Sequence, residues 1–169
     1  MAKKELGKPG LDLIKDFESL VLYVYDDLVP MRKINGKRQY PEWDGSKPKG
    51  TLTIGYGHTN AAAFPLKISQ GLRITKQKAV EVLSGDLAPC VADVNKLVKV
   101  DLTQNQFDAL VSFQFNSNRL RTSTLLKKLN KGQVDAVPAE LMKFVMSKGK
   151  KLRGLVRRRK AEVELWNKA

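Results

Sequence analysis

Hydrophobic positions follow two different periodicities in the first third of the chain. Apolar side chains recur at every third position from Leu11 to Phe17 and predict an amphipathic helix over residues 9 to 19. Residues 21 to 25 are dense in β-branched and aromatic side chains and predict a strand. Residues 51 to 57 predict a second strand, and we expect the two strands to pair as a hairpin.

From about residue 75 the pattern becomes helical. Thr75 is a candidate N-cap for a helix that continues to Leu97, although Pro89 is expected to kink or break it. Thr103 and Gln106 form a capping-box signature for a further helix. Three more helices are predicted towards the end of the chain: residues 123 to 131 with Gly132 as terminator, residues 134 to 146, and residues 155 to 167.

Together these patterns predict an α+β fold that is mostly helical. The 169 residues are within the range of one ordinary domain. We expect a small lobe over residues 1–65, with the first helix and the hairpin, and a helical lobe over residues 66–169, the two flanking a cleft. Residues 28–50 join the predicted strands and hold six Lys or Arg against two acids, so we expect them to form an extended, basic, turn-rich insertion.

The charge balance bears on the partners of the protein. Thirty-one Lys and Arg against 17 Asp and Glu give a net charge of +14, which attracts nucleic acid, anionic lipid surfaces and bacterial cell walls alike. Residues 143 to 160 contain nine Lys or Arg and no acid, and as a helix they could lie along a phosphate backbone. A basic nucleic-acid-binding protein is therefore one hypothesis, although the sequence has neither a zinc-binding spacing nor an aromatic stacking motif.

Two features bear on where the protein folds. Cys90 is the single cysteine, so no intramolecular disulfide can form, and the chain is compatible with a reducing cytoplasm. We interpret Cys90 as a buried, unreactive thiol. The basic N-terminus lacks the apolar region of a signal peptide, because charged residues from Asp12 to Glu18 interrupt it, and no stretch approaches a transmembrane span.

Three carboxylates near the first predicted strand are candidates for acid–base chemistry. Glu18 ends the first helix, where the helix dipole and apolar neighbours would raise its pKa, as a general acid working near neutrality requires. Asp26 and Asp27 end the strand and point to opposite faces, so only one of them can readily face Glu18. Paired carboxylates are the equipment of glycoside hydrolysis. The alternative is a solvated helix-end glutamate and two ordinary turn-forming aspartates.

The segment from Thr53 to His58 carries two glycines at alternate positions. Such glycines weaken a strand and let another group approach the backbone closely. By itself, the segment could equally be a bulged strand end, with Thr53 as an ordinary strand residue and His58 as a structural histidine.

In this order, the pieces resemble the active-site signature of the phage lysozyme family, which includes the T-even phage lysozymes and the lambdoid endolysins. The signature runs through Glu18, Tyr25-x-Asp27 and the segment Thr53 to His58. Four further segments are similar to the lambdoid branch: Leu102 to Phe113, Phe115-Asn116, Ser123 to Leu126 and Gly154 to Arg159. The likeness covers nearly all of the chain from about residue 10, except residues 28–50.

The resemblance implies catalytic roles for three residues. Glu18 matches the general acid that protonates the departing glycosidic oxygen. Asp27 matches the second carboxylate, with Asp26 as the less favoured candidate, and Thr53 matches a threonine that positions the attacking water. Since T-even phage lysozymes invert anomeric configuration, Asp27 is expected to support that water. A nucleophilic Asp27 and a transglycosylase outcome stay open.

The resemblance also implies supporting residues. His58 matches a structural histidine that pairs with an acid on the following helix, at the position of Asp86. Asn116 resembles a polar residue that lines the sugar cleft and binds substrate. Either Arg157 or Arg158 resembles an arginine near the catalytic glutamate, and the alignment does not decide between them.

The implied activity is that of a muramidase, which hydrolyses the β-1,4 bond between N-acetylmuramic acid and N-acetylglucosamine without metal or cofactor. We expect a monomer whose partners are bacterial peptidoglycan of the thin Gram-negative type and an anionic envelope surface. A holin-like partner would release it from the host bacterial cytoplasm to the periplasm and cell wall. Nucleic acid is not an expected partner. Two alternatives stay open, namely a catalytically inactive wall-binding relative and the nucleic-acid-binding protein.

Residues 28–50 are the main departure from the family pattern. In this chain 25 residues separate Asp27 from Thr53, a much longer connection than the pattern has. The segment could extend the hairpin beside the cleft, where Tyr40, Trp43 and the basic residues would touch the glycan or another wall component. It could equally be a surface insertion, because longer loops add closure entropy only slowly.

Overall fold

The computed structural model describes residues 3–168, which divide into two compact units. Unit 1 comprises Met1–Phe17 and Pro89–Ala169, and unit 2 comprises Glu18–Ala88. The lobes predicted from the sequence, residues 1–65 and 66–169, stay a prediction.

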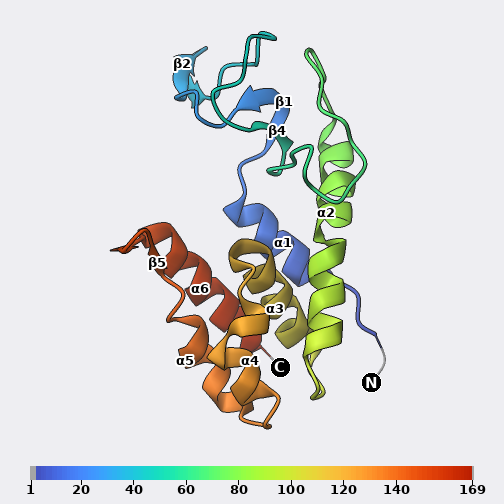
Figure 1. The fold of residues 1–169 in the computed structure, drawn as a ribbon, viewed down its shortest axis with the longest axis vertical. Coiled ribbons are helices and arrows are strands. Elements are labelled where there is room, and N and C mark those ends of the chain that lie inside the picture. Colours follow the sequence, from blue (N-terminus) through green and yellow to red (C-terminus); the bar gives the residue numbers. More distant parts are fainter. Residues whose placement is uncertain (1–2, 169) are drawn as a thin grey trace. The chain divides into compact units, whose positions relative to one another are not determined.

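Unit 2 is built on a short antiparallel strand pair. Strands β1 (Val21–Asp26) and β4 (Leu52–Gly55) pair as the sequence predicted, with Tyr25 opposite Thr53. The register shifts between Val21 and Tyr25, so the strand bends there. The connection between them is not a structureless loop, because it contains a second hairpin, β2 (Arg32–Ile34) with β3 (Lys37–Gln39) (Figure 1).

A small apolar cluster forms the core of unit 2. Val24, Ile54 and Ile68 are buried together. Five partly buried apolar side chains pack against them: Trp43, Leu52, Leu66, Leu72 and Ile74. Trp43 belongs to the inserted segment, so that segment contributes to the core of the unit instead of lying free on its surface.

Helix α2 (Lys76–Leu97) begins where the sequence predicted and runs from unit 2 into unit 1. The Thr75 hydroxyl accepts a hydrogen bond from the Lys78 amide at 3.0 Å, which satisfies one of the free donors of the first turn. Pro89 lies inside the helix, so the expected break is wrong. Its ring removes only one backbone donor, and the flanking turns keep their helical form.

Unit 1 is helical and is centred on α3 (Gln104–Ser117). The predicted capping box is confirmed, because the Thr103 side chain accepts from the Gln106 amide and the Gln106 side chain binds the Thr103 amide. Residues 107 to 114 are all buried, as expected of a helix surrounded on every side. Helices α1 (Lys8–Phe17) and α6 (Arg153–Trp166) both pack on α3 (Figure 1).

The remaining elements of unit 1 are short. They are η1 (Leu120–Thr122), α4 (Thr124–Leu129), η2 (Val134–Ala136), α5 (Val137–Leu141), β5 (Met146–Ser147) and β6 (Lys150–Lys151). The helix predicted over residues 134 to 146 is therefore wrong beyond Leu141. Lys148 and Gly149 have φ of 49° and 74°, which closes a tight β5–β6 hairpin. Residues 143 to 160 consequently do not form one basic helix.

No helix within residues 3–168 combines the length and the apolar character needed to cross a membrane. The architecture is α+β and mostly helical, as the sequence predicted.

Candidate active site

The candidate residues fall into two groups, one in each unit. Unit 2 contains five of them: Glu18, Asp27, Thr53, His58 and Asp86. Unit 1 contains three: Asn116, Arg157 and Arg158.

Three polar side chains gather at one end of the β1–β4 pair. Thr53 lies directly opposite Tyr25, so these two side chains share a face, and Asp27 follows the last residue of β1. The side chains of Tyr25 and Thr53 are hydrogen-bonded. The Thr53 hydroxyl also donates to the Thr51 carbonyl at 3.1 Å, which fixes the position of its oxygen beside the Tyr25 phenol.

Asp26, on the opposite face, has a different environment from Asp27. It is only 4% exposed and accepts hydrogen bonds from the backbone amides of Leu28, Lys49 and Gly50. Burial opposes its ionisation, but these amides and the Lys49 charge outweigh burial and lower its pKa. Asp26 therefore closes the base of the inserted segment, where its oxygens are occupied by the backbone.

Asp27 is exposed and accepts one hydrogen bond, from the Thr51 amide at 2.7 Å. Its carboxylate therefore keeps lone pairs that water or a sugar hydroxyl can reach. Of the two neighbouring aspartates, Asp26 is thus engaged by the backbone and Asp27 is accessible to solvent.

Glu18 follows the last residue of α1 and is half-buried. A Cβ built on Gly57 would lie 3.9 Å from its Oε2 atom, so the carboxylate sits against the backbone of the Thr53 to His58 segment. Gly57 has φ of 85°, which other residues rarely adopt. Ile54 and His58 exchange backbone hydrogen bonds of 3.0 and 2.9 Å, which close this turn beneath Glu18.

Tyr25 connects these acids. Burial raises the pKa of Tyr25 to about 12, and Tyr40, Asp27 and Glu18 add to the rise. Its phenol therefore lies close enough to both carboxylates to sense their charge. Tyr25 belongs to the signature recognised in the sequence, but no role was predicted for it, because its contacts with Thr53 and Tyr40 come from segments far along the chain.

The sequence analysis offered Tyr40 only as a possible glycan contact and did not predict that it lies against Tyr25. Its ring stacks on Tyr25, with centroids 4.2 Å apart and planes inclined by 21°. The Tyr23 hydroxyl also donates to the Tyr40 carbonyl at 2.7 Å. No pattern in the sequence signals this stack, because Tyr40 belongs to a segment without periodicity.

His58 is 1% exposed, and both of its ring nitrogens are engaged. Nε2 donates to the Leu66 carbonyl at 2.8 Å, and Nδ1 lies 2.8 Å from Asp86 Oδ2. Asp86 also accepts from the Phe64 amide at 2.8 Å. The histidine expected to pair with Asp86 thus lies against it, and the pair ties the loop before α2 to that helix.

The candidates in unit 1 surround a buried ion cluster. Arg159 donates to Asn116 Oδ1 at 2.9 Å and pairs with Glu162, which also accepts from the Ser112 hydroxyl at 2.8 Å. Burial raises the pKa of Glu162, and the arginine charges oppose that rise. Asn116 is therefore held by an arginine that the sequence analysis did not single out.

Arg157 and Arg158 both place their guanidinium groups over the Phe17 ring, 5.2 and 5.5 Å from its centre. Arg158 is buried and lies 3.5 Å from Glu162, whereas Arg157 is exposed. Both arginines thus pack on the residue that precedes Glu18 in the chain.

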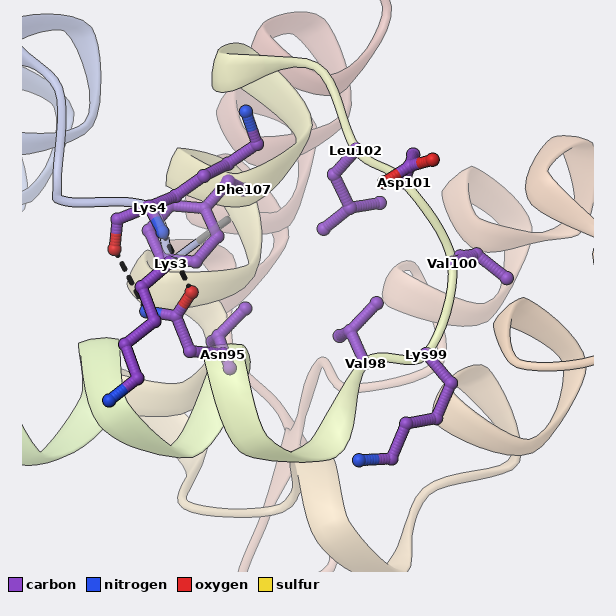
Figure 2. Close-up of a pocket in the computed structure, with 10 residues that line it drawn as sticks. Lys3, Lys4, Asn95, Val98, Lys99, Val100, Asp101, Leu102 and Phe107 are labelled. Atoms are coloured by element: carbon purple, nitrogen blue, oxygen red, sulfur yellow. Dashed lines mark hydrogen bonds between the residues drawn. The ribbon is translucent and has the colours of Figure 1, made fainter. Parts of the chain in front are cut away.

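A cavity of about 240 Å³ lies elsewhere in unit 1. Val98, Leu102 and Phe107 form its apolar floor, and the backbone of Lys4 is bonded twice to Asn95 at its side (Figure 2). None of the candidate residues lines it. Among the described residues, no cluster of His, Cys, Asp or Glu has the grouping that a metal ion needs.

Comparison with known proteins decides the family. The phage lysozyme family model matches residues 32–162. The chain belongs to the phage lysozyme family. The matched range begins after Glu18 and Asp27, and individual relatives align over a longer part of the chain.

Two curated relatives within this family carry that longer alignment. The endolysin of Bacillus phage PZA is 38% identical over 165 residues, which cover 96% of this chain and 55% of the relative. The endolysin of Acyrthosiphon pisum secondary endosymbiont phage 1 is 37% identical over 170 residues, 97% of this chain and 99% of the relative. The chain thus spans about half the length of the Bacillus phage relatives it matches.

Solved structures of phage lysozymes and a muramidase domain share the fold. A P22 lysozyme variant superposes with a TM-score of 0.77 at 27% identity, covering 98% of this chain and 99% of the other. The muramidase domain of SpmX from Asticaccaulis excentricus gives a TM-score of 0.74 at 33% identity, covering 98% and 99%. The lysozyme-like α+β fold expected from the sequence is therefore confirmed.

Proposed function

We propose that this chain is a muramidase, which hydrolyses the β-1,4 bond between N-acetylmuramic acid and N-acetylglucosamine in bacterial peptidoglycan. The observation that carries the proposal is the grouping of Glu18, Asp27 and Thr53 around Tyr25 within unit 2. Membership of a family whose relatives are named endolysins supports the same conclusion.

Glu18 is proposed as the general acid. Its proton passes to the glycosidic oxygen as the bond to the anomeric carbon breaks, which leaves a neutral hydroxyl on the departing sugar. Its half-buried carboxylate, close to Gly57 at the turn that follows β4, is in a position where a bound glycan could receive the proton.

Asp27 and Thr53 are proposed to support the attacking water. The exposed Asp27 carboxylate accepts a proton from that water as the oxygen of the water bonds to the anomeric carbon. The Thr53 hydroxyl, held beside the Tyr25 phenol, positions that water. Asp26 is less suited to this role, because backbone amides occupy its oxygens.

Residues outside the catalytic group are proposed to have supporting roles. Asn116, oriented by Arg159, would bind substrate through its amide, and the His58–Asp86 pair of unit 2 would be structural. We further propose a monomer that needs neither metal nor cofactor. Its partners would be peptidoglycan, an anionic envelope surface and a holin-like protein that releases it to the wall.

Product analysis tests the reaction. Purified peptidoglycan would be digested, reduced with borohydride and examined by mass spectrometry. A muramidase leaves N-acetylmuramic acid at the new reducing end, with the mass of one added water. An N-acetylmuramic acid end in the 1,6-anhydro form, without the added water, would show that the enzyme is a transglycosylase and not a hydrolase. If the folded protein releases no ends at any pH or salt concentration, the enzyme proposal fails and an inactive wall-binding relative takes its place.

A further inference from the structure

The β2–β3 hairpin of unit 2 is a compact cluster of cations. Arg32, Lys33, Lys37 and Arg38 are all exposed, and residues 28 to 41 contain no acid. Within residues 3–168, the structure gives none of these four cations an ion pair with a carboxylate. The hairpin is therefore a local source of positive potential in a chain that is already strongly basic.

The register of the hairpin sets two of these charges against each other. Lys33 lies directly opposite Arg38, so both side chains rise from the same face. Like charges in this position destabilise a strand pair. Asn35 and Gly36, with φ of 50° and 78°, close a two-residue turn that fixes this register. An anion bound between Lys33 and Arg38 would remove the repulsion.

The residues that follow the hairpin are packed against strand β1, which ends one residue before Asp27. The Trp43 amide donates to the Val24 carbonyl at 2.8 Å, and the Trp43 ring packs on the core of unit 2. Tyr40 stacks on Tyr25. Both aromatic side chains of the segment are thus partly buried against unit 2, and neither belongs to β2 or β3.

We propose that the Lys33–Arg38 face of this hairpin binds the phosphodiester groups of an anionic glycopolymer attached to the bacterial wall. The proposal rests on the muramidase function proposed above. Paired Arg and Lys side chains bind phosphate oxygens through charge-assisted hydrogen bonds. A polymer with repeated phosphodiesters can also engage Arg32 and Lys37 on the other face.

Two observations favour a wall-attached polymer over nucleic acid. Proteins that bind single-stranded nucleic acid combine cations with exposed aromatic side chains, and this hairpin offers none. The hairpin and the candidate acids also belong to one compact unit. A polymer linked to the same glycan would let both contacts form together, which raises the effective concentration of the glycan at the acids.

A pair of matched variants tests the proposal. Lys33→Gln/Arg38→Gln removes two charges from the β2–β3 hairpin, and Lys150→Gln/Lys151→Gln removes two from the exposed β5–β6 hairpin of unit 1. Each protein would be sedimented with purified walls that carry a phosphodiester polymer and with the same walls after hydrofluoric acid extraction, which removes the polymer and leaves the glycan.

The expected result is selective. The wild type and the Lys150/Lys151 variant bind the intact walls about tenfold more tightly than the extracted walls, and the Lys33/Arg38 variant loses that difference. Equal losses in both variants would mean that only net charge matters and would overturn the proposal. Equal binding of the wild type to intact and extracted walls would also overturn it. So would a Lys33/Arg38 variant that binds walls normally and loses only its binding to duplex DNA, measured in parallel.

Two further readouts keep folding and function apart from binding. Lys33→Glu should raise the unfolding temperature slightly, because it replaces the repulsion with a cross-strand ion pair, and should still weaken binding to intact walls. Release of reducing ends from extracted walls should be the same for the wild type and the Lys33/Arg38 variant. If neither releases any, the muramidase proposal fails while the binding result stands on its own.

Discussion

Tyr40 stacks on Tyr25 with their ring centroids 4.2 Å apart, although the two residues come from different hairpins of unit 2. Tyr25 is hydrogen-bonded to Thr53 and lies close enough to Asp27 and Glu18 to sense their charges. The inserted segment therefore supports the surroundings of the candidate acids. This contact makes the segment more than a tolerated surface insertion.

Removing the stack should weaken both stability and activity. Tyr40→Ala deletes the ring and should lower the free energy of unfolding by about 1–3 kcal/mol, because the lost aromatic pair also exposes Tyr25. Peptidoglycan cleavage should fall as well, since Tyr25 would no longer be held against Thr53. Tyr40→Phe keeps the ring and is the control. Chemical denaturation and reducing-end release measure the two effects, and equal values for both variants would exclude the supporting role.

Gly57 should be sensitive for two reasons that a matched variant separates. Gly57→Ala forces a side chain into a positive φ and places a methyl group beside the Glu18 carboxylate. Gly149→Ala, at φ of 74° in the β5–β6 turn, meets the same backbone strain in open space. Both should lose about 1–2 kcal/mol of stability. Only Gly57→Ala should lose activity, by about tenfold or more. A comparable loss of activity in both would contradict the placement of Glu18.

The elements with strong local signals could be predicted from the sequence. The capping box at Thr103, the apolar spacing of the first helix and the glycines after Thr53 each act over a few residues, so their pattern is visible in the chain. The hairpin of residues 146 to 151 could not be predicted, because its basic residues are equally compatible with a helix. Its turn also begins at Lys148, which adopts a positive φ although lysine is not a typical turn residue. Likewise, the Tyr40 contact depends on tertiary packing, which has no periodicity.

The His58–Asp86 contact should show a large coupling energy. Both side chains are nearly inaccessible, so truncating either one leaves a buried polar group without its partner. His58→Ala and Asp86→Ala should each lower the free energy of unfolding by about 2–4 kcal/mol. A double-mutant cycle should give a coupling of about 1–3 kcal/mol. A coupling near zero would mean that the two residues stabilise the unit independently.

Asp26 should make the stability of the protein sensitive to acid. Its pKa is lowered in the folded state, so its ionised form contributes stability above the unfolded pKa of about 3.9. That contribution is lost as the pH falls through the folded pKa. Asp26→Asn should therefore be less stable near neutrality and show a flatter pH profile between about pH 5 and pH 2. An unchanged profile in Asp26→Asn would refute the structural role.

The central claim is that Glu18 donates the proton that breaks the glycosidic bond. The most direct measurement is the rate of reducing-end release from purified peptidoglycan by folded Glu18→Gln, with the exposed Glu164→Gln as a charge-matched control. The account predicts a fall of about 10²–10⁴-fold for Glu18→Gln and a rate near that of the wild type for Glu164→Gln. A Glu18→Gln protein that cleaves at the wild-type rate would contradict it.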